Sequence, residues 1–145
     1  MSRRGRDRRT PLARVVASTL ALVVLLASAS SASPSALRGR WGGRTSQRDR
    51  VGFRVDGHRS VVALRITADI RAETCDVRIS LIGTRLRVPI SAADTFRAKL
   101  AHGPSIAVVK GAFASPRRAR GTFSADYHGS CGRGHAEGTW RATHR

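Results

Sequence analysis

Two cysteines, and the histidines beside the second of them, are the residues whose types and spacing could do chemistry. Cys75 and Cys131 are the only cysteines, and His128 and His135 lie three and four residues from Cys131. Thiolate and imidazole groups can hold a metal ion together, but this spacing matches no common zinc pattern. If the chain is exported, as the N-terminal region described below indicates, two cysteines favour a disulfide instead. We therefore expect a Cys75–Cys131 bond, and neither a metal site nor a cofactor.

Hydrolytic chemistry has weaker support. His128 or His135 could act with Asp126 and a serine, because catalytic triads are assembled in space rather than in sequence. However, the chain contains no Gly-x-Ser-x-Gly nucleophile motif. We expect no catalytic residues and no enzyme activity, and a small enzyme using one of these histidines remains an alternative.

A cluster of acids surrounds Cys75, and paired carboxylates could serve glycoside hydrolysis. The sequence places basic residues close to each of these acids. We therefore expect ion pairs here. The acids are Asp69, Glu73 and Asp76, and their expected partners are Arg65, Arg71 and Arg78.

The charge is the main functional clue. The chain has 27 Lys+Arg against 9 Asp+Glu, a net charge of +18, and all but two of its basic residues are arginines. Such a surface suits anionic polymers of the cell envelope. Aromatic residues make up only 5%, which disfavours the base stacking used by nucleic-acid platforms. Arginine bias in the coding sequence is the competing explanation. The candidate anion-contacting residues are Arg65, Arg78, Arg87, Arg97 and Lys99.

These side chains lie on segments that alternate with period two, the pattern of strands with one apolar face. The alternating segments are 51–55, 62–66, 77–81, 86–90 and 96–100, and the last favours a strand over a short helix. Turn signals at Asp56-Gly57 and similar pairs separate them. Pro89 should lie at an edge or bulge because it cannot donate to a ladder.

A Gly-x-aromatic pattern recurs four times and points to closure of the sheet. It occurs at 39–41, 111–113, 121–123 and 138–140. A glycine lets a neighbouring ring cover bare backbone and lets the sheet bend. Trp41 and Trp140 are close to the ends of this region, so pairing of the first and last strands would bring them together. The predicted fold is a single antiparallel meander of about eight strands closing into a small barrel, with an open β-sandwich as the alternative.

The N-terminal region has a different character. Residues 1–14 carry six arginines, and an uncharged apolar run from Val15 to Ala29 precedes small residues. This is typical of a secretory signal peptide. We assign 1–32 to the signal, 33–38 to a linker and 39–145 to the β-domain. An uncleaved signal acting as a membrane anchor is the alternative. Without residues 1–32, 21 basic and 8 acidic residues remain, a charge of +13.

The segment from Gly39 to Val55 resembles uncharacterised small secreted β-domains of high-GC Gram-positive bacteria, and so does the end from Gly111 to Ala142. More loosely, Gly39-Arg40-Trp41 resembles the opening of avidin and lipocalin barrels, in which a late basic residue, here Arg141, would pack over the tryptophan. The resemblance implies a secreted architecture and no particular activity.

The sequence thus predicts a monomeric, non-enzymatic secreted protein that binds a partner or an anionic envelope polymer. We expect no specific nucleic-acid partner, and we expect contact with a membrane only if the signal is not cleaved. The alternative function is a carrier of small ligands.

Overall fold

The computed structural model describes residues 36–145, and this part of the chain is all-β. The signal and anchor predictions for the N-terminus lie outside the described residues. No helix long and apolar enough to cross a membrane occurs in the region from 36 onward. The strands are β1 (Gly39–Thr45), β2 (Arg50–Val55), β3 (Ser60–Arg71), β4 (Asp76–Gly83), β5 (Val88–Pro89), β6 (Thr95–His102), β7 (Ser105–Ser115), β8 (Arg118–Gly129) and β9 (Gly132–His144).

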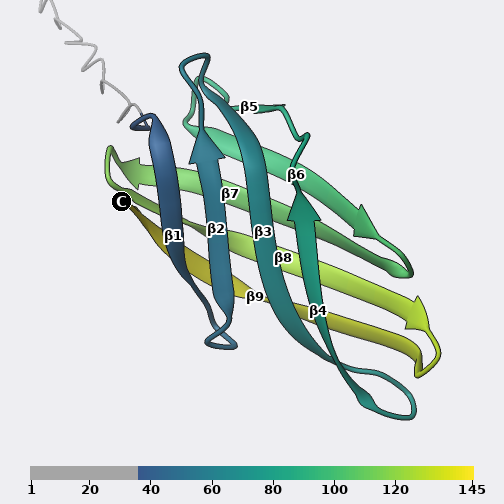
Figure 1. The fold of residues 1–145 in the computed structure, drawn as a ribbon. Coiled ribbons are helices and arrows are strands. Elements are labelled where there is room, and N and C mark those ends of the chain that lie inside the picture. The colour runs from purple at the N-terminus through teal and green to yellow at the C-terminus, as the bar shows by residue number, and fades with distance from the viewer. Residues whose placement is uncertain (1–35) are drawn as a thin grey trace, which may run out of the picture. The chain divides into compact units, whose positions relative to one another are not determined.

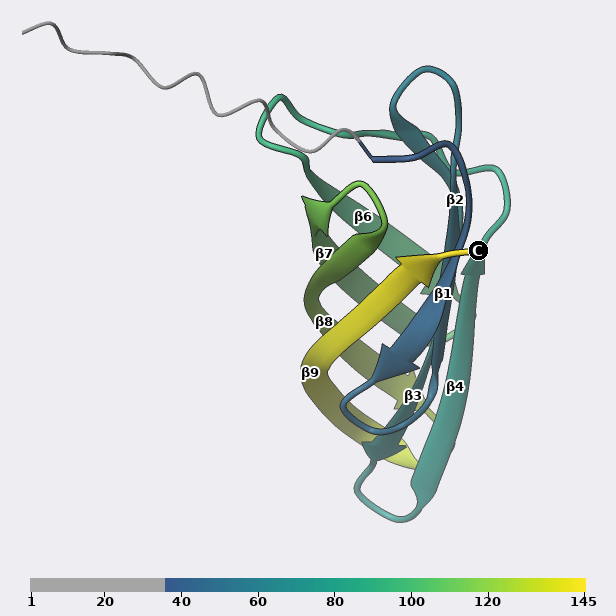
Figure 2. The ribbon, with the colours of Figure 1, turned by 90° about the vertical axis from the view of Figure 1, so that its left-hand side faces the viewer.

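One antiparallel sheet contains all of these strands, and its main path runs in the order β4-β3-β2-β1-β9-β8-β7-β6 (Figures 1 and 2). The first and last strands pair, with Trp41 opposite His144 and Thr45 opposite Trp140. The sheet is nearly closed into a barrel, and one seam between β4 and β6 is unsealed. The predicted eight-stranded barrel is therefore confirmed, but its remaining gap lies in the middle of the chain.

The seam exists because the predicted strand over 86–90 is largely irregular. Only β5 forms a ladder, and it pairs with β3 through Val61–Val88 and Ser60–Pro89. It therefore follows β4 along the same edge of β3 instead of bridging β4 to β6. Pro89 lies on this edge strand, as its missing N–H requires. The side chain of Leu100 packs at Gly83 across the seam, where a Cβ would lie 2.7 Å from Leu100 Cδ2.

The inward faces follow the predicted alternation with one correction. A bulge between Arg54 and Val55 shifts the β2–β3 register. As a result Val61 is fully buried, while Val62, which the simple alternation places inside, is only half-buried. A single extra residue reverses which side chains face the core, and no local sequence signal marks it.

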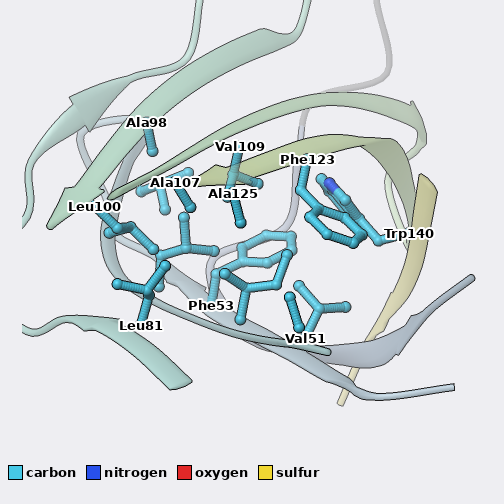
Figure 3. Close-up of a cluster of buried hydrophobic side chains, with 14 of the residues drawn as sticks. Val51, Phe53, Leu81, Ala98, Leu100, Ala107, Val109, Phe123, Ala125 and Trp140 are labelled. Carbon is cyan, nitrogen blue, oxygen red and sulfur yellow. The ribbon is translucent and has the colours of Figure 1, made fainter. Parts of the chain in front are cut away.

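The barrel interior is filled by side chains. All seven aromatic residues of the chain are buried, and five of their rings form one contiguous cluster. Trp41 stacks on Phe53 with ring centroids 5.5 Å apart, and Phe53 lies edge-on to Trp140 at 5.8 Å. Aliphatic residues such as Leu81 and Leu100 fill the neighbouring part of the core (Figure 3).

The Gly-aromatic pattern has the expected geometry. Gly111 and Gly121 are opposite each other on β7 and β8, and Trp140 is the partner of Gly121 on β9. A Cβ at Gly111 or Gly121 would lie 2.8 or 2.7 Å from Trp140 Cζ2, so the indole ring occupies the space that the two glycines leave. Its N–H donates to the backbone carbonyl of Lys110 at 3.2 Å. The bare backbone is thus covered by a ring from the neighbouring strand.

The disulfide links two hairpins at one end of the barrel. Cys75 lies in the β3–β4 turn and Cys131 in the β8–β9 turn, with their Cα atoms 5.5 Å apart. These turns are adjacent at the lower right of Figure 1. The Thr74 N–H also donates to the Cys131 carbonyl at 3.0 Å. The bond closes a loop of 57 residues, for which chain entropy gives a stabilisation of about 4 kcal/mol as an upper figure.

Candidate functional site: a basic outer face

Acidic residues are largely engaged in holding loops. In three turns a carboxylate pairs with an arginine from a different segment: Asp49 with Arg78, Asp56 with Arg87 at 3.5 Å, and Asp94 with Arg59 at 2.6 Å. The first and last of these carboxylates are almost fully buried. A buried carboxylate needs a partner of opposite charge, and removal of the arginine would leave its buried charge uncompensated. These pairs therefore have a structural role.

Asp56 also organises its own turn. Its Oδ1 accepts the N–H groups of His58 and Ser60, both at 2.9 Å. Partial desolvation pushes the pKa of Asp56 upward. The two N–H donors and the nearby Arg87 guanidinium outweigh this effect and hold the pKa below its usual value. The turn is therefore held by the ionised form of this carboxylate.

The acids near Cys75 form cross-strand ion pairs on β3 and β4. Asp69 lies 3.6 Å from Arg78, and Asp76 lies 3.5 Å from Arg71. Arg65 takes part in no ion pair within the described region, and neither does Glu73. Two of the expected pairings therefore form, and Arg65 is left with its charge uncompensated.

His135 and Asp126 are directly opposite on β9 and β8, and Nδ1 of the histidine is 2.7 Å from the carboxylate. Both side chains are about half exposed. In the described region no serine, threonine or cysteine side chain hydrogen-bonds to His135, and His128 is not part of this pair. Nucleophilic catalysis needs a hydroxyl or thiol beside the base. This pair lacks that third member.

Metal ligation by the cysteine–histidine group has no support in the geometry. Cys75 and Cys131 are bonded to each other, so neither offers a thiolate. Residues 36–145 contain no group of three or more side chains able to hold a metal ion.

The tryptophan of the first strand has a different neighbour from the one that the barrel resemblance implies. Arg141 is exposed and faces Arg44, away from the core. The imidazole of His144 lies edge-on to Trp41 instead, with ring centroids 5.5 Å apart. Together with the filled interior, this leaves the small-ligand carrier without an observation that favours it.

A hollow with a volume of about 840 Å³ lies on the outer face of β6–β9. Its outward lining combines basic and hydroxylated side chains with apolar surface from Pro89 and Ala112. The basic and hydroxylated residues are Ser91, Thr95, Arg97, Lys110, Arg120, Thr122, Thr139 and Arg141. Guanidinium, ammonium and hydroxyl groups are the usual donors to phosphate and sulfate oxygens. We refer to this hollow as the basic groove.

A row of arginines continues from the groove across the sheet. The ladder places Arg120 opposite Arg141, Arg141 opposite Arg44, and Arg44 opposite Arg50. These four residues come from β8, β9, β1 and β2, all four are exposed, and none makes an ion pair within residues 36–145. Like charges directly opposite in a sheet destabilise it. The row is therefore a feature that stability alone does not favour.

The five predicted anion-contacting residues are dispersed. Arg97 lines the basic groove, and Lys99 is exposed on the same strand. Arg65 is on β3 and lines a separate hollow. Arg78 and Arg87 pair with acids.

Sequence reasoning missed Lys110, Arg120, Arg44 and Arg50. Arg44 and Arg50 lie on short strands, each of which has a second arginine four residues away. This spacing places both arginines of a strand on the same face, and it was the signal that could have identified them.

Comparison of the chain with models of known protein families, with characterised proteins and with solved structures gives no significant match. Function is therefore inferred from the outer face itself.

Proposed function

We propose that this protein is a non-enzymatic secreted β-domain that binds an anionic polymer of the cell envelope on its basic outer face. The observation that carries the proposal is the row Arg120–Arg141–Arg44–Arg50, which has no acidic partner in the described region. Of the eight acids between residues 36 and 145, five pair with arginines elsewhere, and a sixth, Asp126, lies within hydrogen-bond distance of His135. Polyanion binding offsets the repulsion that the row otherwise imposes on the fold.

The chemistry favours recognition by charge. Every aromatic side chain is buried, so the outer face offers no ring on which a base could stack. Arginine forks bind phosphate or sulfate oxygens in a bidentate way. We therefore expect the polymer's anionic groups to be the recognised feature, and a specific nucleic-acid sequence to make no difference.

The proposed location outside the cell is supported by the disulfide, a bond that forms and persists in oxidising compartments. The signal-like N-terminal sequence points the same way.

Titration of the purified protein with wall teichoic acid at 50 and 200 mM salt tests the proposal. For single-stranded polyanions the logarithm of affinity falls by about 0.7 for each phosphate contact per tenfold rise in salt. Four contacts from the row predict affinity about 50-fold weaker at the higher salt. Absence of binding at 50 mM salt would remove the proposal.

A further inference from the structure

Three neighbouring strands repeat the same spacing of arginines. β1 contains Arg40 and Arg44, β2 contains Arg50 and Arg54, and the end of the chain contains Arg141 and Arg145. In each case the residue midway between the two arginines is small: Gly42, Gly52 or Thr143. Residues four apart share one face of a strand and are about 13 Å apart.

The antiparallel register aligns these three segments. Gly42 is opposite both Gly52 and Thr143. Arg40 is opposite Arg54, and the Arg145 N–H donates to the Arg40 carbonyl at 2.9 Å, which extends the β1–β9 ladder. The arginines therefore form two parallel rows on the outer face, one on each side of a floor of small residues. One is part of the row described above, Arg141–Arg44–Arg50, and the other is Arg145–Arg40–Arg54.

Arginines also stand at both ends of this floor. Arg118 on β8 is opposite Thr143, and Arg65 on β3 is opposite Gly52. The floor is thus surrounded by eight arginines, which we call the arginine ring: Arg40, Arg44, Arg50, Arg54, Arg65, Arg118, Arg141 and Arg145. None of them makes an ion pair within the described part of the chain.

Part of the ring encloses a hollow. A cavity of about 550 Å³ is lined by Arg40, Arg54, Arg65 and Arg145, with Gly52 and apolar atoms at its base. The Arg145 guanidinium lies over Gly42, where any added Cβ would collide with it. The missing side chain at Gly42 therefore leaves room for the Arg145 guanidinium, and the open backbone at Gly52 forms part of the cavity beside it.

We propose that the arginine ring is the site at which a single flexible phosphodiester chain, of the poly(glycerol phosphate) type, lies across β9, β1 and β2. This deepens the proposed function and rests on it. The Cα atoms of the two rows are about 13 Å apart, and the arginine side chains narrow the space between them. This space admits one extended phosphodiester chain. The chain's phosphates contact the two rows, and no aromatic surface is required.

Three sets of substitutions, each removing three positive charges, test the assignment. The ring set is R40Q/R54Q/R65Q, and the groove set is R97Q/K110Q/R120Q, whose three residues line the basic groove. The control set is R85Q/R117Q/R133Q, whose side chains are exposed and make no ion pair in the region from 36 onward. Each protein is titrated with poly(glycerol phosphate) at several salt concentrations, and circular dichroism and thermal unfolding check that it is folded.

The salt dependence separates the outcomes. The ring set should reduce the slope of log affinity against log salt concentration by about 2, because three phosphate contacts are lost and each contributes about 0.7 to the slope. The control set should leave the slope within about 0.5 of the unsubstituted protein. Equal losses in all three sets, or a loss confined to the groove set, would overturn the ring. Tighter binding of a thymidine oligomer with the same number of phosphates would overturn the choice of a base-free chain.

Failure of the broader proposal gives a different result, because the unsubstituted protein would then not bind the polymer at all. Binding by that protein with no effect of the ring set would refute the ring alone.

Discussion

Replacing Arg141 with glutamine should stabilise the protein at low salt. Arg141 has an arginine directly opposite it on both adjacent strands, Arg120 on β8 and Arg44 on β1. An exposed pair of like charges directly opposite each other lowers the free energy of unfolding by a few tenths of a kcal/mol. Removal of two such pairs should therefore raise it by about 0.6 kcal/mol. For about 110 ordered residues this corresponds to a rise in Tm of about 2–3 °C.

Thermal unfolding followed by circular dichroism in about 20 mM salt, where screening is weak, measures this shift. Arg120→Gln relieves one pair of the row and should raise Tm by about half as much. Arg133→Gln, outside the row, serves as the control for loss of a positive charge. Because exposed charges are screened, the gain should shrink strongly in about 0.5 M salt. A fall in Tm, or a gain equal to that of the control, would refute the view that the row stores repulsion.

Further predictions concern the fold. Replacing Cys75 and Cys131 with serine should lower the free energy of unfolding by up to about 4 kcal/mol, measured by urea unfolding; an unchanged midpoint would contradict a role for the bond in stability. Gly121→Ala should lower the free energy of unfolding by more than about 2 kcal/mol because its Cβ meets the backbone of the neighbouring strand and the indole ring of Trp140. Gly103→Ala should lower it by only about 1 kcal/mol, because Gly103 has open space around it and only its φ of +55° is unfavourable for alanine. Similar losses in the two variants would show that the contact with the indole ring does not matter. Since folding lowers the pKa of Asp56, the unfolded state takes up protons first as pH falls, so the stability from this carboxylate is present above its unfolded pKa and is lost in the acid range below about pH 4. Asp56→Asn should therefore flatten the acid limb of a plot of Tm against pH, and an unchanged limb would disprove the effect.

Strands were predictable because their alternation is local. The inward faces of β2, β4 and β6 follow directly from residues such as Phe53, Leu81 and Phe96, which recur with period two. The bulge that buries Val61 was not predictable, because it depends on how β2 and β3 align and not on residue type. The brevity of β5 was not predictable either, because β5 pairs only with Ser60 and Val61 of β3, beside the stretch of that edge that β4 occupies.

The candidate site was less accessible to sequence reasoning than the fold. Which arginines face outward follows from alternation, but which arginines are neighbours depends on register. Arg44 and Arg141 are 97 positions apart in the chain and become partners only through the β1–β9 pairing. The predicted set therefore included Arg97 and Arg65, which line hollows, but could not assemble the row or the ring.

The pairing of the first strand with the last also governs how the molecule can fold. β1 gains its second partner only when β9 is present, so the sheet cannot close before residues 140–144 are available. Contacts between segments so distant in sequence slow folding into the millisecond-to-second range typical of β-barrels. Until that step β1 has one unpaired edge, and a chain cut short before Trp140 would keep that edge exposed to other strands. The arginine ring is completed in the same event, so the proposed polyanion site forms only once the whole domain has been made.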